Sequence, residues 1–344
     1  MAPAHKVESK DDDDILRVAS YHRRDFDLAV IRINPRELEQ IRNSLLRVDR
    51  PASTNLGDLE VLPLEILHEI FSSLDIMSLF KFRQINRQAQ QLVCTVYGYR
   101  TIITHALGVF GAILKTRMAS WFTIHDLLEV LYTGDCLLCG SFGGFVFLPY
   151  LSRCCLPCVE TASQFRLISV TDAKKYFQLN LTNLRNSIPI LRTIPGIYSM
   201  DETPRKRSVQ ILAEKQIYPA IKRCNAEERT APLAQPNKMS MIFRYMATTT
   251  LPYINKASGA IEHGICCTGC QIAIEKDLRS TSREWDTACA LRDRIYSRRG
   301  FLDHFKHCRR AQSLWDASNK GTISVSVPAS VIRGGYFRER IDTV

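Results

Sequence analysis

The residues of this 344-residue chain that are best suited to chemistry are its 12 cysteines, five of which fall between residues 136 and 158. Cys136 and Cys139 have two residues between them, as do Cys155 and Cys158, and fifteen residues separate the two pairs. A tight turn can place two such thiolates about 2.3 Å from one ion, and two turns complete the tetrahedral coordination of zinc. The spacing therefore predicts a zinc site whose ligands are Cys136, Cys139, Cys155 and Cys158.

The residues around these pairs fit a zinc site. Gly140 follows the first pair and tolerates the positive φ that a metal-binding turn needs. Residues 145–151, FVFLPYL, are rich in the β-preferring side chains of a hairpin. Cys154 competes with Cys155 as a ligand, although the x2 spacing prefers Cys155, and buried free cysteines are the alternative to a metal site. Four protein ligands leave no position for a reactive water, so we expect a structural ion and no catalytic residue.

A second group of potential ligands lies nearer the C-terminus. Cys267 and Cys270 form another pair around Gly269, and His304 and Cys308 lie four residues apart in a segment with helical periodicity. Residues four apart share one face of a helix. The sequence thus predicts a second structural zinc site with the ligands Cys267, Cys270, His304 and Cys308. The competing ligands are His263, Cys266, Cys289 and His307, and an ordinary helical histidine and cysteine is the alternative. Because more than a hundred residues separate the two quartets, we expect two independent sites.

The composition of the chain indicates the cellular compartment in which these cysteines lie. The N-terminal residues MAPAHKVESKDDDD are polar and acidic, unlike a secretory signal peptide. The longest apolar runs, such as 106–114, fall short of the ~18 residues that cross a bilayer. We therefore expect no membrane partner and a reducing location, in the cytoplasm, the nucleus or both, where clustered cysteines bind metal rather than form disulfides.

The charge of the chain is strongly positive. The formal net charge is +11, and residues 201–344 carry 24 Lys and Arg against 15 Asp and Glu, with the densest basic segment at 292–310. Such a basic segment can bind a nucleic acid or an acidic protein, or it can be the solvent-exposed face of a helix. It has few interleaved aromatic residues of the type that stacks on nucleic-acid bases, and the chain has no finger of standard C2H2 spacing. Nucleotide-binding, hydrolase and metalloprotease motifs are also absent from the sequence, so we expect a protein that is not an enzyme.

Apolar spacing and capping residues predict mostly helices. Three short helices are expected from Leu62 to Val96, the second capped by Asp75 and the third by Asn86. Further helices are expected at 101–118, at 123–134 with a Thr123–Asp126 capping pair, from about Thr171, at 208–222 and across 279–317. Residues 241–254 favour a strand and 224–240 a linker. Residues 1–58 show little periodicity and are expected to be largely disordered, with one short helix near 35–48.

Residues 59–93 resemble an F-box. The resemblance lies in Leu62-Pro63, Glu65-Ile66-Leu67, Ile70-Phe71, Leu74-Asp75, Leu79 and Ile85-Asn86-Arg87. It implies a three-helix module that binds the Skp-type adaptor of an SCF-type cullin–RING ubiquitin ligase. The adaptor contacts that it implies are Leu62, Pro63, Ile66, Leu67 and Ile70. Leu79 and Ile85 would help to build the module, and Ala89 departs from the aromatic residue that many F-boxes carry in the third helix.

The layout of the chain is also similar to that of fungal F-box proteins with cysteine-rich segments. The F-box is followed in order by CxxCGSFGGFxFLPxxxRCCxxC, TIPGIYS, CxGC and FLxHFxxC. This resemblance covers most of residues 59–316 and concerns organisation rather than substrate.

We therefore expect an α+β, mainly helical protein with an N-terminal three-helix F-box followed by two small zinc-stapled modules with short β-hairpins. The expected segments are 1–58 (largely disordered), 59–105 (F-box-like), 106–200 (helices with the four-cysteine, zinc-ribbon-like segment), 201–258 (basic helix and linker), 259–321 (Cys3His module with a C-terminal helix) and 322–344 (tail). The expected function is that of a non-catalytic substrate receptor of an SCF-type ubiquitin ligase, whose zinc-stapled C-terminal region binds an unidentified protein. The alternative is a zinc-dependent nucleic-acid-binding or regulatory protein.

Overall fold

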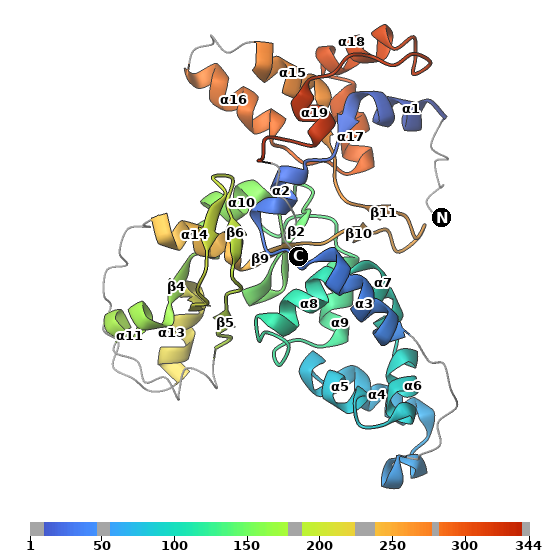
Figure 1. Ribbon diagram of the computed structural model, residues 1–344, viewed down its shortest axis with the longest axis vertical. Coiled ribbons are helices and arrows are strands. Elements are labelled where there is room, and N and C mark those ends of the chain that lie inside the picture. The colour runs from blue at the N-terminus through green and yellow to red at the C-terminus, as the bar shows by residue number, and fades with distance from the viewer. Residues whose placement is uncertain (1–9, 47–55, 178–187, 224–237, 277–281, 339–344) are drawn as a thin grey trace. The chain divides into compact units, whose positions relative to one another are not determined.

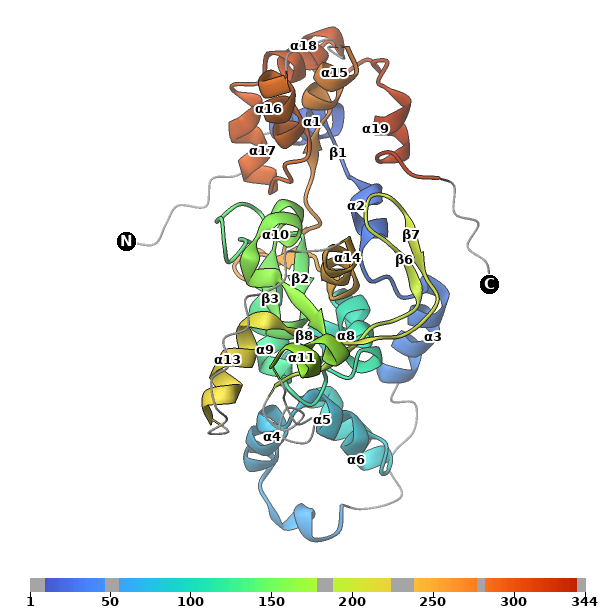
Figure 2. The ribbon, with the colours of Figure 1, turned by 90° about the vertical axis from the view of Figure 1, so that its left-hand side faces the viewer.

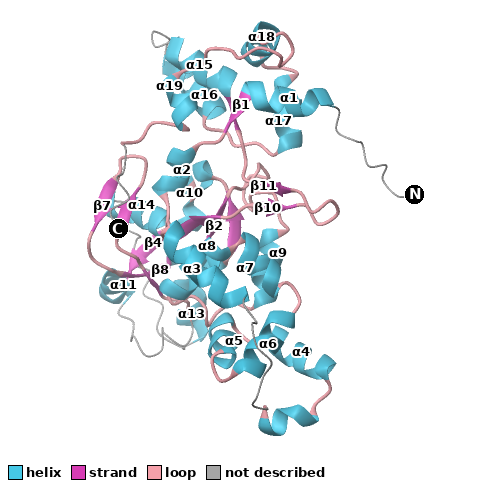
Figure 3. Cartoon of the chain, turned by 45° about the vertical axis from the view of Figure 1, so that its right-hand side comes forward, coloured by secondary structure: helices cyan, strands magenta, loops and turns pink. Residues whose placement is uncertain are grey.

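The computed structural model describes residues 10–46, 56–177, 188–223, 238–276 and 282–338 (Figure 1). Helices predominate and the strands are short, which confirms the predicted fold class (Figure 3). The chain forms two compact units, one comprising Met1–Asp27 and Glu262–Val344 (unit 1) and the other Leu28–Ile261 (unit 2). None of the helices in the described ranges is both long and apolar enough to span a bilayer.

Most of the helices belong to unit 2. They are α3 (Pro35–Leu46), α4 (Leu64–Ser73), α5 (Ile76–Arg83), α6 (Arg87–Thr95), α7 (Tyr99–His105), α8 (Leu107–Lys115), α9 (Ile124–Leu131), α10 (Leu156–Thr161), α11 (Val170–Phe177), α13 (Glu214–Arg223) and α14 (Lys238–Met246). Short 3-10 turns cover Gly57–Val61, Leu148–Tyr150 and Ser163–Phe165. Most of the predicted linker 224–240 lies outside the described residues, and its last three residues begin α14.

The predicted capping residues start their helices. The Asp75 carboxylate accepts a hydrogen bond from the Ser78 N–H (2.9 Å), and the Asn86 side chain accepts one from the Ala89 N–H (2.8 Å). Thr123 and Asp126 form the reciprocal capping box of α9. A cap of this kind typically contributes about 1 kcal/mol, because it satisfies a backbone donor that the first helical turn leaves unpaired.

Helix α6 packs against α4 and α5. The buried apolar side chains that these helices contribute to the core include Leu67, Phe71, Ile76, Leu79, Ala89 and Val93. The Phe71 and Phe82 rings pack with centroids 4.6 Å apart. Ile85 does not join this core, contrary to the role that the resemblance implied, because it follows the end of α5 and is 68% exposed.

The three-helix module is also tied to the helices that follow it. The Ile76 N–H donates to the Phe122 carbonyl (2.8 Å) and the Met77 N–H to the Ala119 carbonyl (3.1 Å). These bonds join the start of α5 to the loop between α8 and α9. The three-helix module is therefore packed against the helices that follow it, and residues 28–261 form one compact unit.

The strands of unit 2 form small antiparallel sheets. The first sheet, in the order β3-β2-β9, contains β2 (Phe145–Phe147), β3 (Ser152–Cys154) and β9 (Thr248–Thr250). The second, in the order β4-β8-β5, contains β4 (Leu167–Ser169), β5 (Leu191–Arg192) and β8 (Gln210–Ala213). Two further pairs are β6 (Gly196–Tyr198) with β7 (Thr203–Arg205) and β10 (Tyr253–Ile254) with β11 (Ile261–Glu262). The β6–β7 pair forms a long ribbon (Figure 2). The β2–β3 hairpin, with Phe145 opposite Cys154, confirms the hairpin predicted between the two cysteine pairs.

Arg153 anchors this hairpin. Its side chain is buried, and its guanidinium donates to the carbonyls of Thr133 (2.8 Å), Pro252 (2.7 Å) and Leu251. Burial disfavours the charged form and lowers the pKa of Arg153 to about 10. The accepting carbonyls, which include that of Leu131 (3.5 Å), compensate for the lost hydration. They hold the cysteine-bearing hairpin against the end of α9 and the segment after β9.

Unit 1 joins the two ends of the chain. Its elements are α1 (Lys10–Ala19), β1 (Ser20–Tyr21), the start of α2 (Arg24–Ala29), β12 (Cys266–Cys267), α15 (Thr268–Lys276), α16 (Ser282–Arg292), α17 (Arg298–Phe305), α18 (Arg309–Ala317) and α19 (Ala329–Arg333). Figure 1 shows α1 beside the C-terminal helices. Strand β1 pairs with β12, with Ser20 opposite Cys267.

The N-terminal segment differs from the sequence-based expectation. Residues 10–46 contain three helices where the sequence predicted little regular structure apart from the helix near 35–48, which α3 confirms. Leu16 and Ala19 are buried against the C-terminal helices. Because those partners lie about 250 residues further along the chain, local periodicity in the sequence does not reveal that this segment forms helices. Residues 1–9 and 47–55 lie outside the described residues.

Three other predictions need correction. Residues 241–246 belong to α14, and within the predicted strand only 248–250 and 253–254 are extended (β9 and β10). The helix was missed because Ile242, Phe243, Tyr245 and Met246 are all buried and leave no polar face to mark it. The expected helix at 208–222 begins with strand β8 before α13. The expected helices at 101–118 and 279–317 are each interrupted, the first at Ala106 and the second at 293–297 and 306–308.

Candidate functional site

The first cysteine quartet comes together as predicted. The Sγ atoms of Cys136, Cys139, Cys155 and Cys158 all lie within 4.8 Å of one another, and those of Cys139 and Cys155 are 3.5 Å apart. A tetrahedral ion about 2.3 Å from each sulfur separates the sulfurs by about 3.8 Å. The quartet therefore has the size of a four-cysteine zinc site. All cysteines in the described part of the chain are free thiols.

Two different local structures position these thiols. The first pair lies on a turn in which the Cys136 N–H donates to the Ser141 carbonyl (2.7 Å) and Gly140 adopts φ +69°, as predicted. In the second pair, Cys155 is the N-cap of α10 and Cys158 lies in its first turn. Cys154 is fully buried on β3 and outside the quartet, so the geometry selects Cys155.

Hydrogen bonds and burial shift the pKa values of the thiols in this quartet in opposite directions. A hydrogen bond from Cys155, together with backbone N–H groups of Leu138 and Cys139, lowers the pKa of Cys136 to about 4. The same hydrogen bond raises the pKa of Cys155, and burial raises that of Cys158 to about 12. A divalent cation at the centre of the quartet would supply the charge that allows the thiols to ionise.

The second quartet also converges. The sulfurs of Cys267 and Cys308 are 3.8 Å apart, and Cys270 Sγ lies 3.4 Å from His304 Nε2. With zinc–nitrogen distances of about 2.0–2.1 Å, a tetrahedral site separates sulfur from nitrogen by about 3.6 Å. The Cys270 N–H donates to Cys267 Sγ (3.4 Å), as in a metal-binding turn. The set fits a Cys3His zinc site.

Tyr296 orients the histidine of this quartet. Its ring stacks on His304 with centroids 4.8 Å apart, and its hydroxyl lies 3.3 Å from His304 Nδ1. Because Nε2 faces the cysteines, a metal-bound His304 carries its hydrogen on Nδ1 and donates it to the Tyr296 hydroxyl. Such a partner fixes the ring and raises its affinity for metal. The sequence signal for Tyr296, an aromatic residue eight positions before a ligand, is too weak to have identified it.

The backbone at this site differs from the single helix that the sequence predicted. Helix α17 ends at Phe305, just after His304, and Cys308 is the N-cap of α18. The extended backbone of an N-cap turns the chain, so the two ligands lie at a corner between helices. The competing residues stay outside the quartet: Cys266, His263, Cys289 and His307.

Gly269 has a role that the sequence did not reveal. A Cβ atom on Gly269 would lie 2.5 Å from the Ala311 nitrogen, because α15 and α18 approach each other closely there. The absent side chain lets the helix that carries Cys270 meet the helix that Cys308 caps. A glycine inside a helical segment is the signal that could have indicated this contact.

The predicted adaptor-binding residues fall into two environments. Ile66 and Ile70 of α4 are 43% and 39% exposed, Pro63 is exposed and Leu62 is half-buried. Leu67 is only 5% exposed and belongs to the core of the module. Further exposed apolar side chains in the same module are Leu59, Val61, Leu64 and Ile85.

The basic segment 292–310 is partly neutralised. Arg292 pairs with Asp293 (2.7 Å), Lys306 with Asp303 (2.8 Å) and Arg298 with Asp13. These pairs leave fewer free cations than the sequence suggests. They weaken the nucleic-acid alternative, which depends on many free contacts to phosphates.

Comparison with known proteins identifies the helical module. Residues 59–101 match the family model of the F-box domain. The chain therefore contains an F-box domain, the module with which substrate receptors of SCF-type ubiquitin ligases bind Skp-type adaptors. Searches of curated proteins and of solved structures found no match to the chain.

Proposed function

We propose that this protein is a non-catalytic substrate receptor of an SCF-type cullin–RING ubiquitin ligase. The F-box domain at residues 59–101 carries the proposal. In this function the F-box binds a Skp-type adaptor, the rest of the chain binds a target protein, and ubiquitin transfer belongs to other subunits.

The surface of the F-box supports an adaptor interface. Ile66 and Ile70 lie four residues apart on α4, so they share one face, and Leu64 and Val61 add exposed apolar area nearby. Single exposed apolar residues are common, but several within ten residues of one short module are typical of a protein interface. Burial of each large side chain in a complex would contribute about 1.5–3 kcal/mol. Leu67 acts from inside, because it holds α4 against the core.

Two structural zinc ions complete the proposed receptor. The ion of the four-cysteine site fastens the turn at Cys136 to the β2–β3 hairpin, and the Cys3His ion fastens β12 and α15 to the corner between α17 and α18. Both have four protein ligands, which leaves the ions a structural role. Free thiols throughout the described chain agree with a reducing location in the cytoplasm or nucleus.

Adaptor capture tests the proposal. The protein, co-expressed with a Skp-type adaptor, is expected to retain it through affinity purification. The double variant Ile66→Asp/Ile70→Asp is expected to lose it, because two carboxylates would be desolvated without partners. Ile332→Asp is the matched control, since Ile332 is an exposed isoleucine on α19 in unit 1. Retention of the adaptor by the folded double variant would refute the assigned face, and failure of the unaltered protein to capture it would refute the proposed function.

A further inference from the structure

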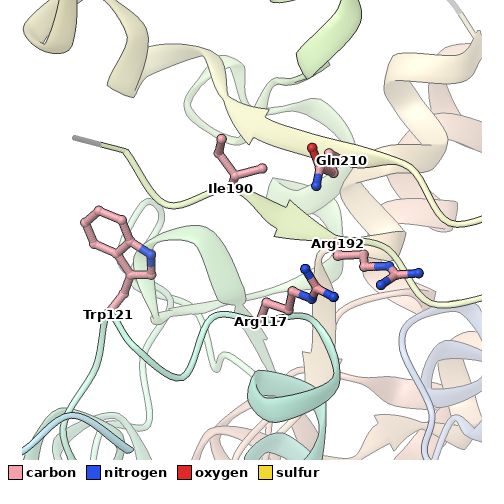
Figure 4. A pocket seen from close by; sticks show the side chains of 5 residues that line it. All are labelled: Arg117, Trp121, Ile190, Arg192 and Gln210. Carbon is pink, nitrogen blue, oxygen red and sulfur yellow. The ribbon is translucent and has the colours of Figure 1, made fainter. Parts of the chain in front are cut away.

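A basic pocket lies in unit 2, and no metal-ligating residue is among the residues that line it. Its volume is ≈ 260 Å³, and Arg117, Trp121, Ile190, Arg192 and Gln210 line it (Figure 4). Figure 4 shows that these side chains come from the loop after α8, from β5 and the residue before its start, and from β8. Two of these residues are arginines, and none of the described lining residues is acidic.

Arg117 occupies a position that ordinarily favours glycine. Helix α8 ends in a Schellman motif: the Met118 N–H donates to the Ile113 carbonyl (2.9 Å) and the Arg117 N–H to the Leu114 carbonyl (3.2 Å). Arg117 therefore has φ +64°, which a side chain with a Cβ atom disfavours. An arginine held in this conformation at the edge of a pocket suggests that the side chain is there for a ligand.

The sheet aligns the opposite wall. Arg192 pairs with Gln210 across β5 and β8, so both side chains stand on the same face, and the Arg192 N–H donates to the Thr116 carbonyl (2.9 Å). This bond fixes β5 against the loop that carries Arg117. Ile190, two residues before Arg192, adds an apolar side chain beside them.

The guanidiniums of Arg117 and Arg192 face solvent at the pocket. Within the described ranges, no side-chain hydrogen bond or ion pair joins Arg117 or Arg192 to another residue, and both side chains are exposed. Lys206 and Arg207, in the segment that leads into β8, are exposed as well. Two exposed guanidiniums at one pocket make a local positive potential that attracts oxyanions.

We propose that this pocket binds an acidic linear peptide segment. The guanidiniums of Arg117 and Arg192 hold the oxygens of a carboxylate or phosphate, Gln210 adds a hydrogen bond, and Trp121 and Ile190 cover a neighbouring apolar side chain. The pocket is smaller than the ~300–1,000 Å³ of typical small-molecule sites, which favours one or two side chains of a peptide. The inference rests on the proposed function in one respect: the segment would belong to a target protein.

Fluorescence anisotropy with the purified full chain tests the proposal. The probe is a labelled peptide Gly-Ser-Asp-Phe-Asp-Ser-Gly, compared with an Asn version and with a version in which phosphoserine replaces Asp. The Asp peptide, the phosphoserine peptide or both are expected to bind, and the preference identifies the source of the oxyanion. Binding is expected to weaken with added salt, and the Asn peptide is expected to bind at least about tenfold more weakly.

Three variants connect binding to the pocket. Arg117→Gly removes the guanidinium and relieves the positive φ, so it is expected to unfold at an equal or higher temperature while it binds the acidic peptide about tenfold more weakly. Arg192→Gln is expected to weaken binding by a similar factor. Arg87→Gln, which removes an exposed arginine from α6, is the charge-matched control and is expected to bind as the unaltered protein does.

The results that overturn the proposal are specific. Equal binding of the acidic and Asn peptides, or unchanged binding by Arg117→Gly and Arg192→Gln, would show that the pocket is not an oxyanion site. The assay contains no ligase component, so its outcome is independent of adaptor capture. Loss of peptide binding with intact adaptor capture would contradict this inference alone, and the reverse would contradict the proposed receptor function alone.

Discussion

Replacement of Gly269 by alanine has two opposing effects on stability. Alanine favours a helix more than glycine does, but its Cβ atom would clash where α15 and α18 meet at the Cys3His site. In an open helix the change from glycine to alanine stabilises a protein by roughly 0.5–1 kcal/mol. At Gly269 the new Cβ would lie 2.5 Å from the Ala311 nitrogen, whereas ordinary contacts begin at 3.4 Å. Helices α15 and α18 must then separate by about 0.9 Å, the difference between these distances, and such overpacking typically costs about 1–3 kcal/mol.

The separation acts directly on the metal ligands. Cys270 follows Gly269 in α15, and Cys308 caps α18, so the displacement enters the ligand set. Metal sites tolerate deviations of only about 0.2 Å in ligand distance. We therefore expect Gly269→Ala to weaken zinc binding by about tenfold or more and to lower the unfolding temperature of unit 1. Chelator competition with a zinc indicator measures the first effect and circular dichroism the second.

Gly108 provides the matched control. It lies inside α8, and a Cβ atom there would meet nothing within 4 Å. Gly108→Ala is expected to raise stability slightly and to leave both zinc sites unchanged. If Gly269→Ala kept its zinc affinity and stabilised the protein as Gly108→Ala does, the close approach of α15 and α18 and its link to the metal site would be wrong.

Three further predictions concern the metal sites. Cys139→Ser is expected to reduce the zinc content from two ions per chain to one, whereas Cys154→Ser is expected to keep both ions; elemental analysis distinguishes them, and equal zinc loss would contradict the ligand assignment. Tyr296→Phe removes the hydroxyl that accepts from His304 Nδ1 and is expected to lower zinc affinity by about tenfold, measured by chelator competition, while loss of the fold instead would point to a packing role. Zinc must displace protons from the cysteine thiols, and the pKa of one of them, Cys158, is raised to about 12. Zinc affinity is therefore expected to fall as the pH is lowered. An affinity that does not change between about pH 8 and 6 would be inconsistent with thiolate ligands.

Local signals in the sequence were sufficient for the features that depend on neighbouring residues. The x2 spacing of Cys136 and Cys139, with Gly140 after it, defines a turn without reference to the rest of the chain. Asp75 and Asn86 begin their helices as predicted because a capping side chain bonds a backbone N–H only three residues away. The F-box helices follow from the same short-range periodicity.

Features that depend on distant partners could not be predicted in this way. Strand β1 is ordered by pairing with Cys266 and Cys267, which lie about 250 residues further along the chain. Leu67 and Ile66 are adjacent and equally apolar, yet only Leu67 is buried, because the position of α6 decides which face of α4 is covered. The pocket around Arg117 and Arg192 likewise arises from three segments that only the fold brings together.

Native mass spectrometry of the protein co-expressed with a Skp-type adaptor tests the central proposal most directly. We expect a complex of one chain, one adaptor and two zinc ions, and we expect Ile66→Asp/Ile70→Asp to release the adaptor without loss of zinc. Folded, zinc-loaded protein that remains free of the adaptor in the same experiment would contradict the assignment of this chain as a substrate receptor.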